Sequence, residues 1–233
     1  MKKLNETVVM KNALARAQQT LKLTEKRIIA TAMAKIDSTA SKLDYKNETS
    51  RTIKINASEY QKTAKLKNQT DAYRDMMSAT TELINKQLTI KQNTITSTET
   101  IKINWIEATR YEAGSGEIEI RFTQSIMPYL VAIKDRFTEY QLKEMAGIKS
   151  IYTWRLIEFL TSWSTEKTGQ RTISINNFKE MMNTPTSYKT ADVTQKIIGP
   201  TITELKKRNW EIKYETKKTG RKITHITFAW RKP

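Results

Sequence analysis

Apolar and polar positions along this chain change period in an ordered way, from helical spacing to strict alternation and back. In the first part, apolar residues at helical spacing predict helices over Val8–Gln19 and Thr24–Asp37. The polar stretch that follows, Ser38–Ser50, is expected to be a loop. The chain therefore begins with a helical segment before the first alternating run.

A sequence repeat then sets the domain organisation. Arg51–Asn56 reads RTIKIN, and Arg171–Asn176, about 120 residues later, reads RTISIN. A second echo follows each copy, as Thr81–Leu83 and Thr203–Leu205 both read TEL. Each copy predicts a strand, a short helix, a longer helix and paired strands, which is the order of a winged helix. The predicted fold is α+β, with two tandem winged-helix (helix-turn-helix plus β-hairpin wing) domains.

The first predicted domain covers residues 1–123. Its pattern continues with a glycine-containing turn at Gly114–Gly116 and a last alternating strand, after which a boundary is expected near Thr123. The expected elements are strand Arg51–Asn56, helices Ala57–Ala64 and Gln69–Lys86, paired strands Leu88–Lys91 and Ile101–Thr109 with a polar wing tip Gln92–Thr100 between them, and strand Glu117–Phe122.

The second predicted domain covers residues 124–233 and ends in a hairpin with a basic tip, Lys217–Arg221. Gly220 lies in that tip and suits a tight turn. The expected elements are helices Ser125–Ile133, Phe137–Met145 and Ser150–Trp163, strand Arg171–Asn176, helices Phe178–Met182 and Ala191–Lys207, and strands Trp210–Thr216 and Lys222–Trp230.

The net charge of the chain indicates what class of molecule it binds. The chain has 41 basic and 24 acidic residues, a net charge of +17, and from Ser187 to the end the count is 12 against 4. Such an excess indicates a polyanionic partner, most commonly nucleic acid. The alternative is a basic surface that serves only solubility.

Several other classes are disfavoured by what the sequence lacks. There is no cysteine, no apolar run of membrane-spanning length, and no continuous apolar segment near the start that would suit a signal peptide. A cytoplasmic protein is therefore expected. No glycine-rich phosphate-binding motif occurs, and His225 is the only histidine. We expect no enzyme activity, no cofactor and no metal site; a nickase, which would need a histidine pair beside a tyrosine, is the least favoured alternative.

The long helix Ala191–Lys207 has a polar face that could read DNA. On a helical wheel its inward positions are Val193, Ile197, Ile198, Thr201, Ile202 and Leu205. Glutamine can pair with adenine and lysine with guanine or phosphate, so the outward face is the expected base-reading surface. The candidate DNA-binding residues there are Asp192, Gln195, Lys196, Gly199, Thr203 and Lys206, with Lys189 before the helix and Lys217, Lys218, Arg221 and Lys222 on the wing. A merely solvated helix surface would show the same polarity.

The long helix of the first domain is expected to contribute weaker contacts, because its outward face is less basic. Its expected inward positions are Tyr73, Met76, Met77, Thr80, Leu83 and Ile84. The candidate DNA-binding residues are Gln69, Thr70 and Arg74, with Lys65 and Lys67 before the helix.

The chain resembles the Rep_3 family of iteron-binding plasmid replication initiators (initiator replication proteins), along nearly its whole length. The most specific similarity lies in Phe137–Tyr140, Ala146–Ser150 and Tyr152–Trp163. Further similar stretches are Lys11–Leu14, Leu23–Arg27, Ala72–Asp75, Trp105–Tyr111, Gly116–Phe122 and Ile126–Leu130. The long helix Ala191–Lys207 matches loosely, so a DNA sequence preference does not transfer.

This resemblance implies a bacterial protein that binds repeated origin sites (iterons) in duplex DNA, promotes origin opening, and recruits the host initiator and replicative helicase. It further implies a homodimer in equilibrium with monomer, dimerisation and auxiliary DNA contacts by the first domain, main DNA recognition by the second, and repression of the protein's own gene. A winged-helix repressor without initiator activity is the alternative.

Overall fold

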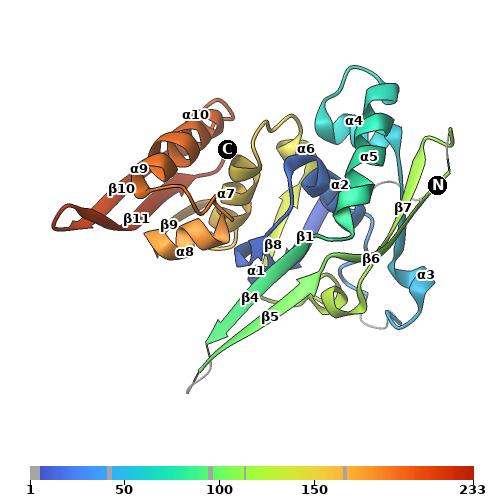
Figure 1. The fold of residues 1–233 in the computed structure, drawn as a ribbon, viewed down its shortest axis with the longest axis horizontal. Helices are drawn as coiled ribbons and strands as arrows, with labels where there is room; N and C mark the ends of the chain where they lie inside the picture. Colours follow the sequence, from blue (N-terminus) through green and yellow to red (C-terminus); the bar gives the residue numbers. More distant parts are fainter. Residues whose placement is uncertain (1–5, 41–43, 94–96, 113, 165–166) are drawn as a thin grey trace. The chain divides into compact units, whose positions relative to one another are not determined.

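The computed structural model describes residues 6–40, 44–93, 97–112, 114–164 and 167–233, and it divides into two compact units, Met1–Lys149 and Ser150–Pro233 (Figure 1). The sequence placed the boundary near Thr123. The structure moves it to residue 149, because the segment after residue 123 pairs with the beginning of the chain.

That pairing joins β1 (Thr7–Lys11) to β8 (Phe137–Gln141) as an antiparallel ribbon, with Val8 opposite Tyr140 and Met10 opposite Thr138. These four side chains are buried. The predicted helices Val8–Gln19 and Phe137–Met145 are therefore wrong over these residues. Each strand takes its ladder partner from a segment far away in sequence, and local periodicity carries no record of that partner.

The other helices and strands of the first unit follow the predicted order more closely. Between the terminal strands lie α1 (Asn12–Arg16), β2 (Gln18–Gln19), α2 (Leu23–Met33), α3 (Glu48–Arg51), β3 (Thr52–Asn56), α4 (Ala57–Ala64), α5 (Gln69–Leu83), β4 (Gln87–Asn93), β5 (Thr98–Asn104), β6 (Ile106–Tyr111), β7 (Glu117–Phe122), the 3-10 helix η1 (Gln124–Tyr129) and, after β8, α6 (Leu142–Met145). The predicted helix Ser125–Ile133 is thus a shorter 3-10 turn that contains Pro128.

The first copy of the repeat is capped and packed as its sequence suggests. Asn56 accepts a hydrogen bond from the Glu59 backbone N–H at 2.9 Å, and the Glu59 carboxylate accepts one from the Asn56 N–H at 3.0 Å. This reciprocal capping box fixes the start of α4 directly after β3. Helices α4 and α5 then contact each other and α2, so the three helices form one cluster.

Sheet pairing in the first unit departs from the expected winged-helix pattern. β4 and β5 form the predicted hairpin, and β2 lies beside β4. The predicted strand Ile101–Thr109, however, is divided at Trp105, which is fully buried. β6, the part after Trp105, turns away to pair with β7, and β7 pairs with β3. The strand of the first repeat therefore joins a different hairpin from the wing.

The second unit is a regular winged helix. It contains α7 (Ile151–Thr161), β9 (Thr168–Ser174), α8 (Ile175–Met181), α9 (Thr190–Asp192), the π-helical segment η2 (Val193–Ile198), α10 (Gly199–Lys206), β10 (Glu211–Thr219) and β11 (Lys222–Arg231). The sheet order is β10-β11-β9, all antiparallel. Phe178 of α8 and Phe228 of β11 pack in the core with ring centroids 5.8 Å apart.

Close packing at one position of this unit requires glycine. A Cβ atom on Gly169 would lie 2.3 Å from Cζ2 of Trp230, its ladder partner on β11. The Trp230 ring is buried, and its Nε1 donates a hydrogen bond to Ser164 Oγ at 3.0 Å. The ring consequently has no room to retreat from a larger side chain.

The segments α9, η2 and α10 form one continuous helix, Thr190–Lys206, which we call the reading helix. Its middle is π-helical, with the Gly199 N–H bonded to the Thr194 carbonyl. Pro200 follows at the start of α10. Proline has no N–H, and its ring collides with the carbonyl of the residue four positions earlier in an α-helix. Widening the helix just before Pro200 relieves that collision.

Candidate nucleic-acid interface

The inward face of the reading helix is the predicted one. All six expected core positions, Val193, Ile197, Ile198, Thr201, Ile202 and Leu205, are buried, none more than 7% exposed. The opposite face consequently points to solvent. Gln195, Lys196, Thr203 and Lys206 are exposed on it, whereas Asp192 and Gly199 are half-buried. The structure therefore brings the candidate base-reading residues together on one face.

Lys196 is held in place on this face by two neighbours. Its Nζ lies 2.7 Å from Oδ1 of Asp192, one turn earlier, and 4.9 Å from the centre of the Tyr188 ring. The second carboxylate oxygen of Asp192 accepts a hydrogen bond from the Lys189 N–H at 3.0 Å, which caps the start of the helix. Asp192 thus connects the helix start to the lysine expected to read bases.

The same contacts shift the ionisation of both groups. The hydrogen bond and charge of Asp192 raise the pKa of Lys196 above its ordinary value. The hydrogen bonds from Lys196 and from the Lys189 N–H lower the pKa of Asp192. Both groups are accordingly charged at neutral pH, so a DNA phosphate that approaches Lys196 also meets a full negative charge.

The wing carries the expected row of basic side chains. β10 and β11 pair along their length, with a register shift at Lys217/Lys218, and Gly220 adopts φ 59° in the turn. Lys217, Lys218, Arg221 and Lys222 are all exposed. His225, paired with Lys217, is half-buried and contacts Thr224 Oγ1 at 3.1 Å. An exposed tip rich in lysine and arginine suits phosphate contacts.

The equivalent surface of the first unit is less free to bind an anion. α5 begins with Asn68 as its cap, so Gln69 and Thr70 lie exposed in its first turn. Arg74 is exposed, but its guanidinium already pairs with Asp71 at 2.6 Å. The outward face of α5 therefore offers a partly neutralised arginine.

Lys65 and Lys67 lie in the turn before α5, and both are exposed. Lys65 ends α4 in a left-handed conformation, and its Cδ lies 2.7 Å from where a Cβ on Gly147 would stand. The stem of Lys65 is thus packed, while its exposed charge remains available to a phosphate. Of the expected inward positions of α5, Met76, Thr80 and Leu83 are buried and Tyr73 and Met77 are half-buried. The prediction is wrong for Ile84, which lies at the end of the helix and is 38% exposed.

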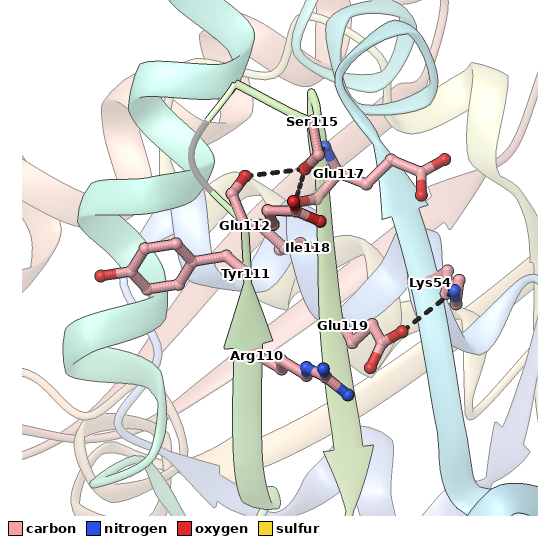
Figure 2. A pocket seen from close by; sticks show the side chains of 8 residues that line it. All are labelled: Lys54, Arg110, Tyr111, Glu112, Ser115, Glu117, Ile118 and Glu119. Carbon is pink, nitrogen blue, oxygen red and sulfur yellow. Dashed lines mark hydrogen bonds and ion pairs between the residues drawn. The ribbon is translucent and has the colours of Figure 1, made fainter.

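A shallow depression on the first unit has a different character. About 520 Å³ in volume, it lies over β3, β6 and β7 and is lined by Lys54, Arg110, Tyr111, Glu112, Ser115, Glu117, Ile118 and Glu119 (Figure 2). Lys54 pairs with Glu119 at 3.1 Å. Its carboxylates outnumber its basic groups, so this depression does not suit a polyanion.

Sequence reasoning missed three residues that contribute to the basic surfaces. Tyr188 supports Lys196 from a turn that is eight residues earlier, a contact that no helical spacing encodes. Lys91 and Lys102 lie on the same face of the β4–β5 hairpin, because they stand opposite Thr100 and Thr89. Strict alternation along the two predicted strands was the signal that could have placed these lysines together.

Two negative findings apply to the part of the chain that the structure describes. Within it, no cluster of three or more histidine, cysteine, aspartate or glutamate side chains could hold a metal ion. Nor does any of its helices have the length and apolar character needed to cross a membrane.

Two solved structures share this fold. The Pi initiator protein in complex with iteron DNA matches 99% of this chain and 99% of its own, with a TM-score of 0.79 and 22% identity. A structure of domains 2 and 3 of RctB matches 89% of this chain and 81% of its own, with a TM-score of 0.50 and 6% identity. Both likenesses concern the fold.

Two proteins of Escherichia coli are similar to this chain in sequence. The chain is 26% identical to the PI protein of Escherichia coli, over 94% of this chain and 81% of that protein. It is 25% identical to a replication initiation protein of Escherichia coli over 79% of this chain, but it spans only 57% of that relative's length.

Family matches cover both units. Residues 7–161 match the family described as Initiator Replication protein, WH1, and residues 174–230 match that described as Initiator Rep protein, WH2. The expected pair of tandem winged-helix domains is thereby confirmed. Because the two matches cover most of the sequence in order, the chain belongs to the initiator replication protein family.

Proposed function

We propose that this protein is a plasmid replication initiator that binds repeated sites in duplex DNA through the reading helix and the wing of its second unit. The observation that carries this proposal is the exposed polar face of the reading helix, opposite six buried core positions and next to a wing with four exposed basic side chains. That arrangement suits base contacts by the helix and phosphate contacts by the wing.

Support for initiator activity comes from relatives. The match to the Pi initiator, solved with iteron DNA, extends over nearly all of this chain. Origin opening, recruitment of the host initiator and replicative helicase, and repression of the protein's own gene belong to the proposal as later steps. Family membership supports these steps, and all would occur in the bacterial cytoplasm.

The two units have separate roles in this proposal. The second unit carries the main DNA recognition, because it has both the exposed reading face and the basic wing. The first unit adds phosphate contacts from Lys65, Lys67 and Arg74, and it supports a homodimer in equilibrium with monomer. The β6–β7 hairpin offers an unpaired strand edge, β6, on which a second copy could add.

A replication assay tests the initiator function directly. The gene and its flanking DNA are placed on a plasmid that lacks any other origin, in a host that does not otherwise maintain it. Stable inheritance that is lost when a stop codon interrupts the gene supports an initiator. Failure to replicate, together with specific binding upstream of the gene, would instead identify the alternative, a winged-helix repressor.

A further inference from the structure

The charge that lies closest to the expected base-reading lysine is a carboxylate. Asp192 Oδ1 stands 2.7 Å from Lys196 Nζ, and Tyr188 covers the ammonium group from another side at 4.9 Å. Lys196 remains 54% exposed and Asp192 28% exposed. The pair therefore presents both a positive and a negative group to whatever enters the groove beside the helix.

The two kinds of DNA acceptor respond differently to this pair. A phosphate carries a full negative charge, so Lys196 attracts it and Asp192, a few ångströms away, repels it. The N7 and O6 acceptors of guanine are neutral and are not repelled in this way. An ammonium group has three N–H donors. Lys196 can therefore keep its bond to Asp192 while donating to a base edge.

We infer that Asp192 is a specificity-determining residue that acts through Lys196: it penalises capture of the lysine by phosphate and leaves the lysine free to donate to a base edge. This inference rests on the proposed function, since it assigns a role within the reading surface. On matched DNA the Asp192–Lys196 pair stays intact. On unmatched DNA a phosphate that binds Lys196 either meets the Asp192 carboxylate at close range or draws the lysine away from Asp192 and Tyr188, and both outcomes cost free energy.

Asp192→Asn tests the inference without removing the helix cap. The asparagine side-chain oxygen can still accept the hydrogen bond from the Lys189 N–H, the contact that Asp192 makes at the third position of the helix. A matched control is Glu211→Gln, which makes the same change in net charge at an exposed position on β10, outside the reading helix. Thermal unfolding of both variants checks that the fold is retained.

The probes are the tightest duplex selected from a randomised library and a scrambled duplex of the same length and composition. We expect Asp192→Asn to raise affinity for the scrambled duplex about two- to fivefold more than Glu211→Gln does, within the range for an exposed ion pair. Affinity for the selected duplex should change no more than in the control. The salt dependence on scrambled DNA should steepen by about 0.9, the contribution of one added phosphate contact.

Coupling to Lys196 separates this role from a general charge effect. In a Lys196→Met background, Asp192→Asn should change affinity for scrambled DNA only as much as Glu211→Gln does. The inference is overturned if Asp192→Asn matches Glu211→Gln in the wild-type background, or if its larger effect survives without Lys196. Loss of affinity for the selected duplex alone also overturns it, because Asp192 would then contact a base directly. If the unaltered protein selects no sequence at all, the proposed function fails together with the inference.

Discussion

The wing of the second unit should hold phosphates, and its contribution should be measurable as salt dependence. Lys218 lies near the end of β10 and Arg221 in the turn that leads to β11, and both are exposed. We predict that replacing both by alanine weakens binding to matched and scrambled duplex by the same factor, because phosphates carry no sequence information.

The size of the effect follows from the number of phosphate contacts. Each contact contributes about 0.9 to the slope of log affinity against log salt, which is about 3.5-fold between 50 and 200 mM salt. With about six to ten contacts the unaltered protein should lose a thousandfold or more over that range. Removing two contacts should lower the slope by about 1.8. Between 50 and 200 mM salt, the factor by which affinity falls should then be about twelvefold smaller for the double variant than for the unaltered protein.

Fluorescence anisotropy of a labelled duplex over this salt range measures both quantities. Lys213→Ala is the control for loss of a single charge, since it removes one exposed lysine from β10, away from the turn. The reasoning is refuted if the double variant keeps the slope of the unaltered protein, or if it loses affinity for the matched duplex alone. The second result would mean that the wing reads bases.

Three further results are expected. Gln195→Ala should cost about 1–3 kcal/mol on the matched duplex and relax the preference at one base pair, measured against single-base variants; equal losses on scrambled DNA would contradict base reading. Gly169→Ala should lower the free energy of unfolding in urea by about 1–3 kcal/mol, because the new methyl group collides with the Trp230 ring; an unchanged midpoint would contradict this. The full chain should dimerise in sedimentation experiments while fragment 150–233 stays monomeric, and a fragment that dimerises equally well would place the interface in the second unit.

Local patterns in the sequence were sufficient to predict elements that have their own apolar face or capping residues. The inward positions of the reading helix follow from apolar spacing alone, and all are buried. β3 and α4 were also predicted within a residue, because alternation defines the strand and the capping residues Asn56 and Glu59 define the helix start. In such elements the sequence near a residue largely determines its environment.

Elements that depend on distant partners were not predictable in this way. Val8 and Met10 lie opposite Tyr140 and Thr138, more than a hundred residues later, and the periodicity of so short a run does not reveal so distant a partner. Trp105 divides one apparent strand into two, because its buried ring lies where the chain changes from one sheet to another.

The candidate site also combines a feature that the sequence predicts with features that it does not. Exposure of Lys196 was predictable from the helical wheel, whereas its contacts with Asp192 and Tyr188 depend on side-chain geometry. The position of Asp192 one turn earlier allowed a pair with Lys196. Tyr188 lies outside the helix, so its approach depends on the turn that precedes Lys189.

The π-helical segment in the reading helix affects how residue numbers correspond between relatives. A π-helical turn closes its hydrogen bonds over five residues instead of four, so it contains about one residue more than an α-helical turn. A relative whose equivalent helix is α-helical throughout would cover the same core with one residue fewer. Its counterpart of Gln195 would then be displaced by one position in a gap-free alignment. Equivalent base-reading positions should consequently be assigned by counting from the nearer of the buried residues Val193 and Ile202, which bracket the wide turn.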